Sequence, residues 1–270
     1  MTTFSFPSMR RLFRYLGETD ALVELTELSA RSFIAWAWQS GNVAAFIEDQ
    51  SRQHGVCVNL GEVDILHDHL SRSYIVTVYQ SAERFLHEFR KEHRALYGKE
   101  WVGDADDTDP LTVSLRNVAA TETEAERRVG ADLVSRFQYY RLVRNWAVHT
   151  KASDITKPQA AFEKIAPYSS EHLDKFGAVK APHRPSELCF DDFVLFSRLT
   201  KEIAERLCRI AEPPTDHWLR SFPVRRFKRL EKNPVRMKNA VGGRLRTEYG
   251  MDAATAIWIA DEICGSLAQR

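Results

Sequence analysis

The stretch VDILHDHLSRSYIVTVYQSAERFLHEFRKEHRAL, residues 63–96, decides the fold of this 270-residue chain. Apolar side chains recur along it at steps of four and three residues, which places them on one face of an α-helix. These residues are Leu66, Leu70, Tyr74, Val78, Ala82, Phe85 and Phe89. The stretch is long enough for a main helix of a bundle, so we predict a helix from about Val63 to Leu96.

Helical periodicity also predicts helices over most of the remaining chain. No convincing alternation of polar and apolar residues predicts a strand. Residues 20–48 are expected to form one or two helices, interrupted near Ser40–Gly41. Further helices are expected at residues 191–210 and 253–267. The apolar positions that indicate the first of these helices are Leu22, Leu25, Leu28, Phe33, Trp36 and Ala37.

A helix that leads to the most informative motif is predicted to begin at Thr121. Thr121 and Glu124 have the spacing of a capping box, and the apolar pattern continues from there to Ala147. Residues 151–188 lack strong periodicity and contain several prolines, which predicts a long loop.

The predicted fold class is all-α, with a helical bundle core, additional N-terminal helices and a basic C-terminal helical appendage. Pro213-Pro214 marks the boundary, so the expected domains are residues 1–212 and residues 213–270.

The bulk composition is that of an ordinary soluble protein, with 44% hydrophobic and 28% charged residues. The four cysteines are scattered without a CxxC pair, which is typical of free thiols in a reducing compartment. The N-terminal MTTFSFPSMRRLFRYL has no long apolar core and does not read as a signal peptide. No stretch approaches ~18 apolar residues, so we expect a cytoplasmic protein without a membrane span.

Two patterns that resemble metal sites lack the required spacing. The acidic loop at residues 104–109 has neither the glycine nor the twelfth-position carboxylate of an EF-hand. Two of the potential zinc ligands at residues 54–69 are two positions apart near a helix start and point in different directions. We therefore expect no metal and no cofactor. No metal-binding role is assigned to the four potential ligands His54, Cys57, His67 and His69.

The formal net charge of +1 conceals a strongly basic segment at residues 218–247. It holds ten basic residues and one acid, a charge of +9, against 28 basic and 36 acidic residues elsewhere, a charge of −8. Cations interleaved with Phe222 and Phe227 suit phosphate neutralisation and base stacking on single-stranded RNA. Alternatively, the segment docks on the acidic remainder of the chain. The expected RNA contacts are Arg141, Lys151, Arg220, Arg225, Arg226, Lys228, Arg229, Lys232, Arg236 and Lys238.

The sequence RNWAVH at residues 144–149 places an arginine, an amide and a histidine within six residues. Arg144 offers a permanent, fork-shaped cation for a phosphate, and an imidazole such as that of His149 titrates near neutral pH. On a straight helix the two residues are about 140° apart, so one site needs a wrapped arginine stem, a distorted helix or two facing copies. Alternatively, both residues only satisfy the carbonyls and dipole at a helix C-terminus.

The surrounding sequence YYRLVRNWAVHT resembles the R-N-x3-H form of the R-x4-6-H motif of the HEPN superfamily. The likeness extends over roughly residues 60–212, and its specific part is the six motif residues. It implies an all-α domain that dimerises with two motifs facing a shared cleft, and a metal-independent endoribonuclease. The family's catalytic arginine and histidine correspond to Arg144 and His149, and its intervening polar residue corresponds to Asn145.

The chain departs from the family pattern at two places. Members that pair with a nucleotidyltransferase antitoxin often carry a tyrosine two residues after the histidine, where this chain has Lys151. The acidic and basic pair that the family places on an earlier helix has no clean match. Glu83 and Glu88 are candidates by position only, with solvent-facing helix charges as the alternative.

The resemblance implies a homodimer that cuts RNA through the 2′-hydroxyl and leaves a 2′,3′-cyclic phosphate and a 5′-hydroxyl. His149 would act as general acid or base, Arg144 as phosphate clamp, and Asn145 as the orienting group. A role in a toxin or anti-phage system follows by family analogy, with a regulatory or antitoxin protein as partner. Two alternatives stay open: a non-catalytic RNA-binding module, and a helical interaction protein whose basic tail binds an acidic protein.

Overall fold

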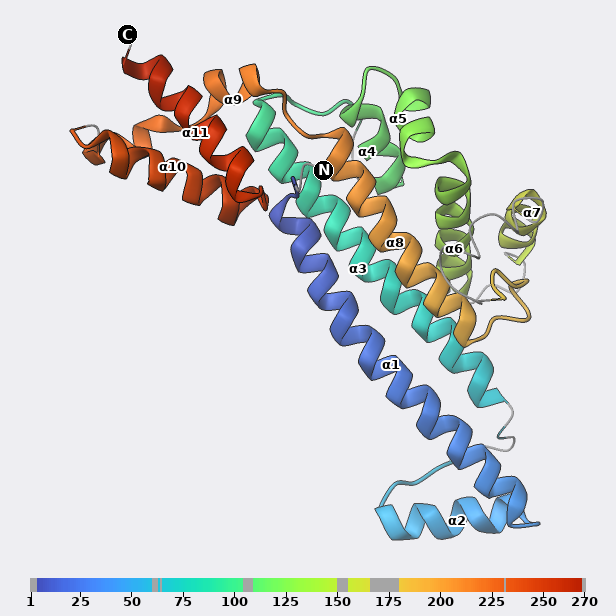
Figure 1. Cartoon of the computed structure of the whole chain (residues 1–270). Coiled ribbons are helices and arrows are strands. Elements are labelled where there is room, and N and C mark those ends of the chain that lie inside the picture. The colour runs from blue at the N-terminus through green and yellow to red at the C-terminus, as the bar shows by residue number, and fades with distance from the viewer. Residues whose placement is uncertain are drawn as a thin grey trace. The chain divides into compact units, whose positions relative to one another are not determined.

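The protein is all-α in the residues that the computed structural model describes (Figure 1). Those residues are 4–59, 63, 65–103, 109–149, 155–165, 180–230 and 232–268. Helices account for 81% of the described residues, and no strand occurs within these ranges. The predicted fold class is confirmed.

The helices follow one another without long gaps in the described ranges. In chain order they are α1 (Pro7–Gln39), α2 (Val43–His54), α3 (Ile65–Tyr97), α4 (Pro110–Val118), α5 (Glu122–Val129), α6 (Ala131–His149), α7 (Thr156–Ile165), α8 (Phe190–Ile210), α9 (Thr215–Ser221), the 3-10 helix η3 (Val224–Leu230), α10 (Pro234–Tyr249) and α11 (Ala253–Ala268).

The chain forms two compact units that interleave in sequence. Unit 1 contains residues 1–14, 82–131 and 201–270, and unit 2 contains residues 15–81 and 132–200. Helices α1, α3 and α8 each contribute to both units. The domain boundary at residues 212 and 213 stays a prediction.

Unit 2 is a bundle whose aromatic side chains join α3, α6 and α8. The ring of Phe137 on α6 lies 6.0 Å from that of Tyr79 on α3 and 5.7 Å from that of Phe196 on α8. Tyr74 and Phe193 join α3 directly to α8, with ring centroids 5.7 Å apart. Helix α1 completes the bundle, because Ser197 on α8 donates a hydrogen bond of 2.7 Å to Asp20 on α1.

Along the buried face of α1 in unit 2, apolar side chains recur every seven residues. Leu16, Val23, Ala30 and Ala37 are at most 7% exposed. The periodicity that predicts this helix is confirmed, but its bulkiest members lie on the opposite face and are 59–67% exposed: Leu22, Leu25, Leu28 and Trp36.

Unit 1 has an aromatic core of its own. Trp218 on α9 packs edge-on against Tyr249 at the end of α10, with ring centroids 4.9 Å apart. Phe4 stacks on Tyr249 at 5.9 Å, and Phe6 meets Phe89 on α3 edge-to-face at 5.2 Å. Phe4 and Phe6 are therefore part of this core.

Three predicted boundaries are wrong. The first helix begins at Pro7 and not at residue 20. Thr121 caps a helix as predicted, since its hydroxyl accepts the N–H of Glu124 at 3.1 Å. That helix ends at Gly130, whose φ of 108° belongs to a region that favours glycine, and α6 begins anew at Ala131. The predicted loop at residues 151–188 contains α7, a ten-residue helix.

None of the helices in the described ranges combines the length and the apolar character that crossing a bilayer requires. All four cysteines are free thiols, as predicted.

Candidate functional site

The motif occupies the last turns of α6 in unit 2. Helix α6 remains α-helical through His149, so the distorted-helix alternative is not observed. On this helix Arg144 and His149 leave the axis about 140° apart. The side chain of His149 lies outside the described residues, as does Lys151.

The guanidinium of Arg144 is held by two uncharged groups. Its Nη1 donates a hydrogen bond of 3.1 Å to Oδ1 of Asn145. Its carbon Cζ lies 5.2 Å from the ring centroid of Tyr79, a residue of α3 that is only 4% exposed. A cation over a tyrosine face is attracted by the ring quadrupole. The arginine is thereby directed toward α3.

Arg144 still has an unsatisfied hydrogen-bond donor in the described ranges. Its Nε is buried and has no hydrogen-bond partner among the described residues. Within the same ranges no carboxylate forms an ion pair with it, and it donates to no main-chain carbonyl. The alternative that Arg144 caps the C-terminal carbonyls of α6 is therefore not observed. A half-buried cation without a counter-ion favours an anionic ligand.

A second arginine lies beside the motif on α3. The guanidinium of Arg72 stands over the ring of Trp146, with 4.5 Å from Cζ to the ring centroid, and it pairs with Asp68 at 3.4 Å. Arg141, a predicted RNA contact, is half-buried on α6 and donates from Nε to Gln138 at 2.7 Å.

Tyr139 and Tyr140, five and four residues before Arg144 on α6, are fully buried. The Tyr140 hydroxyl donates to the carboxylate of Asp192 on α8 at 2.9 Å, and the Tyr139 hydroxyl donates to the carbonyl of His183. Burial raises the pKa of Tyr140 well above its usual value, so this hydroxyl stays a neutral donor.

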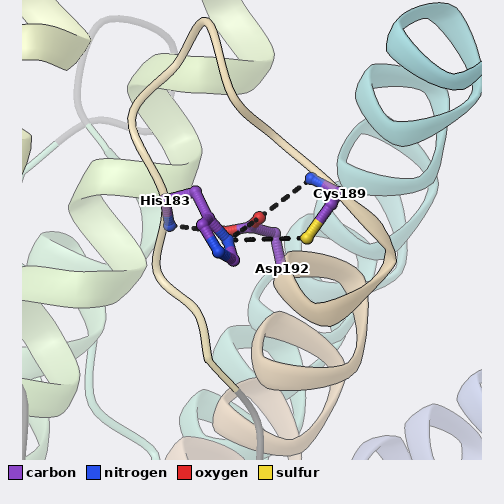
Figure 2. Close-up of side chains that lie close together, drawn as sticks. All are labelled: His183, Cys189 and Asp192. Atoms are coloured by element: carbon purple, nitrogen blue, oxygen red, sulfur yellow. Dashed lines mark hydrogen bonds and ion pairs between the residues drawn. The ribbon is translucent and has the colours of Figure 1, made fainter.

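These contacts lead to a polar cluster that the sequence analysis missed, formed by His183, Cys189 and Asp192 (Figure 2). Asp192 is completely buried, and each of its oxygens accepts two hydrogen bonds. Oδ1 accepts from the Tyr140 hydroxyl and from the main-chain N–H of His183 at 2.9 Å. Oδ2 accepts from Nδ1 of His183 at 2.8 Å and from the main-chain N–H of Cys189 at 3.0 Å.

The pKa values of His183 and Cys189 are both raised. The hydrogen bond that Nδ1 of His183 donates to the Asp192 carboxylate raises the pKa of His183 above its ordinary value, although partial burial opposes this. Burial raises the pKa of the Cys189 thiol. One signal in the sequence marks the cluster: Asp192 is the third residue of α8, the position from which a carboxylate accepts the N–H of the capping residue, Cys189.

Among the described residues, this cluster is the one group of three histidine, cysteine or acidic side chains close enough to share an ion. It contains none of the four residues considered from the sequence, His54, Cys57, His67 and His69. Of the acidic loop, residues 104–108 lie outside the described residues. Asp109 is the N-cap of α4 and accepts the N–H of Thr112 at 3.1 Å.

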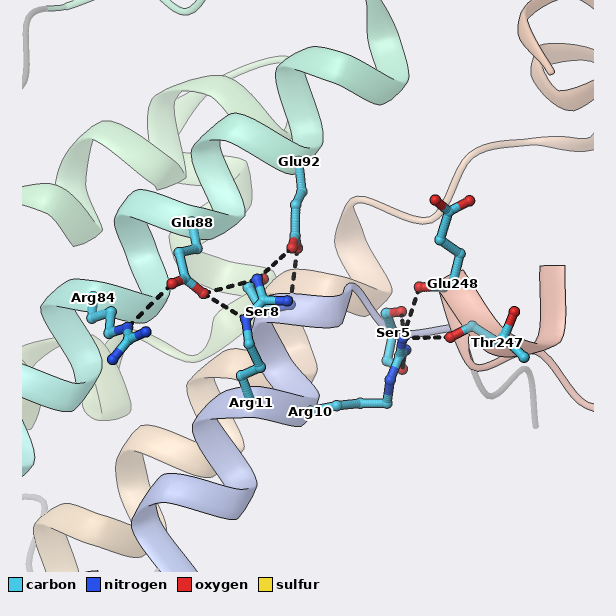
Figure 3. Close-up of polar contacts among 9 residues, drawn as sticks. All are labelled: Ser5, Ser8, Arg10, Arg11, Arg84, Glu88, Glu92, Thr247 and Glu248. Atoms are coloured by element: carbon cyan, nitrogen blue, oxygen red, sulfur yellow. Dashed lines mark hydrogen bonds and ion pairs between the residues drawn. The ribbon is translucent and has the colours of Figure 1, made fainter. Parts of the chain in front are cut away.

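Glu88, one candidate for the family's earlier acidic residue, belongs to an ion-pair network in unit 1 (Figure 3). Arg11 on α1 pairs with Glu88 and with Glu92, each at 2.8 Å, and Arg84 pairs with Glu88 at 3.2 Å. Glu83 lies in the same unit, whereas the motif lies in unit 2. Glu88 is therefore occupied by structural ion pairs.

The basic segment, residues 218–247, is partly folded into unit 1. Trp218 and Phe222 are 2% and 6% exposed, so they do not present a surface for base stacking. Arg220 pairs with Asp216, and Lys238 pairs with Asp261 at 2.5 Å. The side chains of Arg225 and Lys228 lie outside the described residues. Five predicted RNA contacts are exposed: the ion-paired Arg220, and Arg226, Arg229, Lys232 and Arg236.

The same segment lines a cavity of about 350 Å³ in unit 1. Trp218 and Tyr249 contribute aromatic surface, and Arg226 and Arg244 contribute positive charge. Arg244 is already paired with Glu248, another lining residue, through a hydrogen bond of 3.0 Å. These contacts agree with the alternative in which the basic segment docks on acidic residues of the chain.

Comparison of the chain with protein-family models, with curated proteins and with solved structures gave no match in any of the three.

Proposed function

We propose that this protein is a HEPN-type endoribonuclease that cuts RNA without a metal ion at its motif. The observation that carries the proposal is the state of Arg144. Its guanidinium is fixed by Asn145 and Tyr79, its Nε is buried without a partner in the described ranges, and no carboxylate there neutralises it. Such a group is ready to bind a phosphate.

The reaction that these residue types support is an internal transesterification. The ribose 2′-oxygen attacks the adjacent phosphorus, and the bond from phosphorus to the 5′-oxygen breaks. His149 takes the 2′-hydroxyl proton or gives a proton to the leaving oxygen. Arg144 holds the non-bridging oxygens and stabilises their added negative charge, while Asn145 keeps the guanidinium in place. The products are a 2′,3′-cyclic phosphate and a 5′-hydroxyl.

The active form in this proposal is a homodimer. Because α6 is regular through His149, the positions of Arg144 and His149 in one copy lie on different sides of the helix. Two facing copies would let Arg144 of one meet His149 of the other. This arrangement follows the family resemblance and removes the geometric difficulty.

RNA docking is assigned to the exposed part of the basic segment. Arg229, Lys232 and Arg236 are exposed in the described ranges, and they are available to neutralise phosphates. The same observation favours the second candidate, a module that binds RNA without cutting it. In biological terms we propose a toxin or anti-phage effector, restrained by a regulatory partner protein.

The test compares wild type with His149→Ala on mixed RNA in the presence and absence of EDTA. We expect the wild type to produce cyclic-phosphate ends in both conditions and the variant to produce none, while both bind RNA with similar affinity. RNA binding without cleavage by the wild type would favour the binding module. Growth arrest on expression of the wild type, absent for the variant, is the expected cellular result.

A further inference from the structure

Three metal-binding side chain types converge where residues 180–189 lead into α8 (Figure 2). Nδ1 of His183, Sγ of Cys189 and a carboxylate oxygen of Asp192 all lie within 4.8 Å of one another. The residues come from a nine-residue interval, so the helix start and the preceding segment fix all three together. Neither the motif on α6 nor the basic segment contributes to this cluster.

The spacing of the donor atoms suits a tetrahedral ion. Sγ of Cys189 lies 3.5 Å from Nδ1 of His183. Bonds of about 2.3 Å from zinc to sulfur and about 2.0 Å from zinc to nitrogen place those two atoms about 3.5 Å apart. Nδ1 and Oδ2 of Asp192 are now 2.8 Å apart, which is a hydrogen-bond distance. They need to separate by only about half an ångström to share an ion.

The carboxylate of Asp192 is already supported as a metal ligand would be. The Tyr140 hydroxyl and the main-chain N–H of His183 hold Oδ1, and the main-chain N–H of Cys189 holds Oδ2. Ion binding at Oδ2 would replace one contact, the hydrogen bond from Nδ1 of His183. Hydrogen bonds that orient a ligating carboxylate are a regular feature of metal sites.

The charges around the cluster favour a cation over a phosphate. Besides Asp192, the side chains of Asp191 and Glu187 act on His183 with negative charge and contribute to its raised pKa. The nearby Arg184 is paired with Glu163 at 3.9 Å. Negative potential of this kind repels RNA and attracts a divalent ion.

We propose that His183, Cys189 and Asp192 bind a zinc ion, with water in the fourth position. The thiol proton of Cys189 leaves to solvent. The Nδ1 proton of His183 moves to Nε2 in the neutral ring or leaves to solvent from the charged ring. Solvent reaches the site because the His183 side chain is 27% exposed. The site ties the segment at residues 180–189 to α8, and it stands whether or not the protein cuts RNA.

The experiment is a cobalt titration of the metal-free, full-length protein. Co²⁺ occupies zinc sites, and a thiolate ligand gives it a charge-transfer absorption in the near ultraviolet. We expect this absorption to saturate at one ion per chain and to disappear when Zn²⁺ is added. Cys189→Ser should lose the absorption and weaken Co²⁺ binding at least about tenfold.

Cys57→Ser is the matched control, because Cys57 is an exposed free thiol outside the cluster. It should give the wild-type spectrum. His183→Gln provides a second variant if Cys189→Ser does not fold, as judged by far-ultraviolet circular dichroism. An absent band in folded wild type, or an undiminished band in Cys189→Ser or in His183→Gln, would overturn the zinc site.

Discussion

Arg144 is a cation whose direct contacts in the described ranges carry no charge. An amide oxygen and an aromatic ring position it without neutralising it. Other arginines, such as Arg11 between Glu88 and Glu92, are already neutralised by ion pairs within the fold. This difference is the reason why we propose Arg144 as a phosphate-binding arginine.

Replacing Arg144 should remove most of the cleavage activity. Loss of a preorganised charge at the transition state costs about 10²–10³ in rate, so we expect that reduction for Arg144→Ala. Arg144→Lys should recover little of it, because an ammonium lacks the planar fork of donors. Single-turnover cleavage rates measure both effects. Arg127→Ala, which removes an exposed charge from α5, serves as the control and should keep the wild-type rate.

A buried histidine in unit 1 should make the protein acid-sensitive. His93 is 6% exposed, its Nδ1 accepts a hydrogen bond of 3.0 Å from Trp101, and burial lowers its pKa to about 4. The depressed pKa gives stability that is present above the unfolded value of about 6.5 and is lost as the pH falls toward 4. Between pH 7 and pH 5 this loss is about 2 kcal/mol.

Urea unfolding of wild type and His93→Gln at the two pH values measures this effect. The amide oxygen of glutamine also accepts from Trp101 but does not titrate. The free energy of unfolding of the wild type should therefore fall by about 2 kcal/mol more than that of the variant. Equal losses would show that His93 is not the acid-sensitive group.

The motif could be found from sequence because its six residues are contiguous, whereas the zinc cluster could not. Asp192 interacts with His183 across nine positions of a segment without periodicity, and with Tyr140 on another helix. Only the three-dimensional packing brings those groups together. The adjacent acids Asp191 and Asp192 look alike in sequence, yet Asp192 alone is completely buried.

At the scale of elements, periodicity predicts helices well but does not say which face is covered. The prediction for α3 agrees with the structure within two residues at each end, because its stripe is wholly apolar from Leu66 to Phe89. In α1 the leucines mark a helix but not its packed side. Small side chains such as Ala30 and Ala37 allow a neighbouring helix to approach closely, and they carry little hydrophobic signal. The helix break at Gly130 depends on one glycine that a helical pattern can also tolerate.

A matched pair of substitutions tests the assigned faces of α1. Val23 is 7% exposed and Leu25 is 61% exposed. Val23→Ala should lower the free energy of unfolding by about 1–3 kcal/mol through lost burial and the cavity left behind. Leu25→Ala should change it by less than about 0.5 kcal/mol, although it removes more carbon atoms. A larger change in the free energy of unfolding for Leu25→Ala than for Val23→Ala, measured by chemical denaturation, would contradict this assignment of the buried and exposed faces of α1.

At the scale of the whole molecule, the charge asymmetry has two components that sequence alone does not separate. Part of the basic segment pairs with acids of unit 1, as Lys238 does with Asp261. The rest, including Lys232 and Arg236, is exposed. A charge count includes both parts equally, because it contains no information on which side chains find partners.

The exposed part should dominate the salt dependence of RNA binding. Each phosphate contact to a single strand contributes about 0.7 to the slope of log affinity against log salt. The double variant Lys232→Gln/Arg236→Gln should therefore reduce the slope by about 1.4. Arg127→Gln/Arg128→Gln removes the same charge from α5 and should leave the slope unchanged. Equal reductions by both pairs would indicate a response to net charge alone.

The most direct test of the account is cleavage of one RNA pool made in two forms, with free and with methylated 2′-hydroxyl groups, by the wild-type protein in EDTA. A transesterification through the 2′-oxygen predicts cleavage of the unmodified pool alone, with 2′,3′-cyclic phosphate ends, and no cleavage of either pool by Arg144→Ala. Cleavage of the methylated pool, 3′-hydroxyl ends, or full activity of Arg144→Ala would contradict the proposed role of the motif.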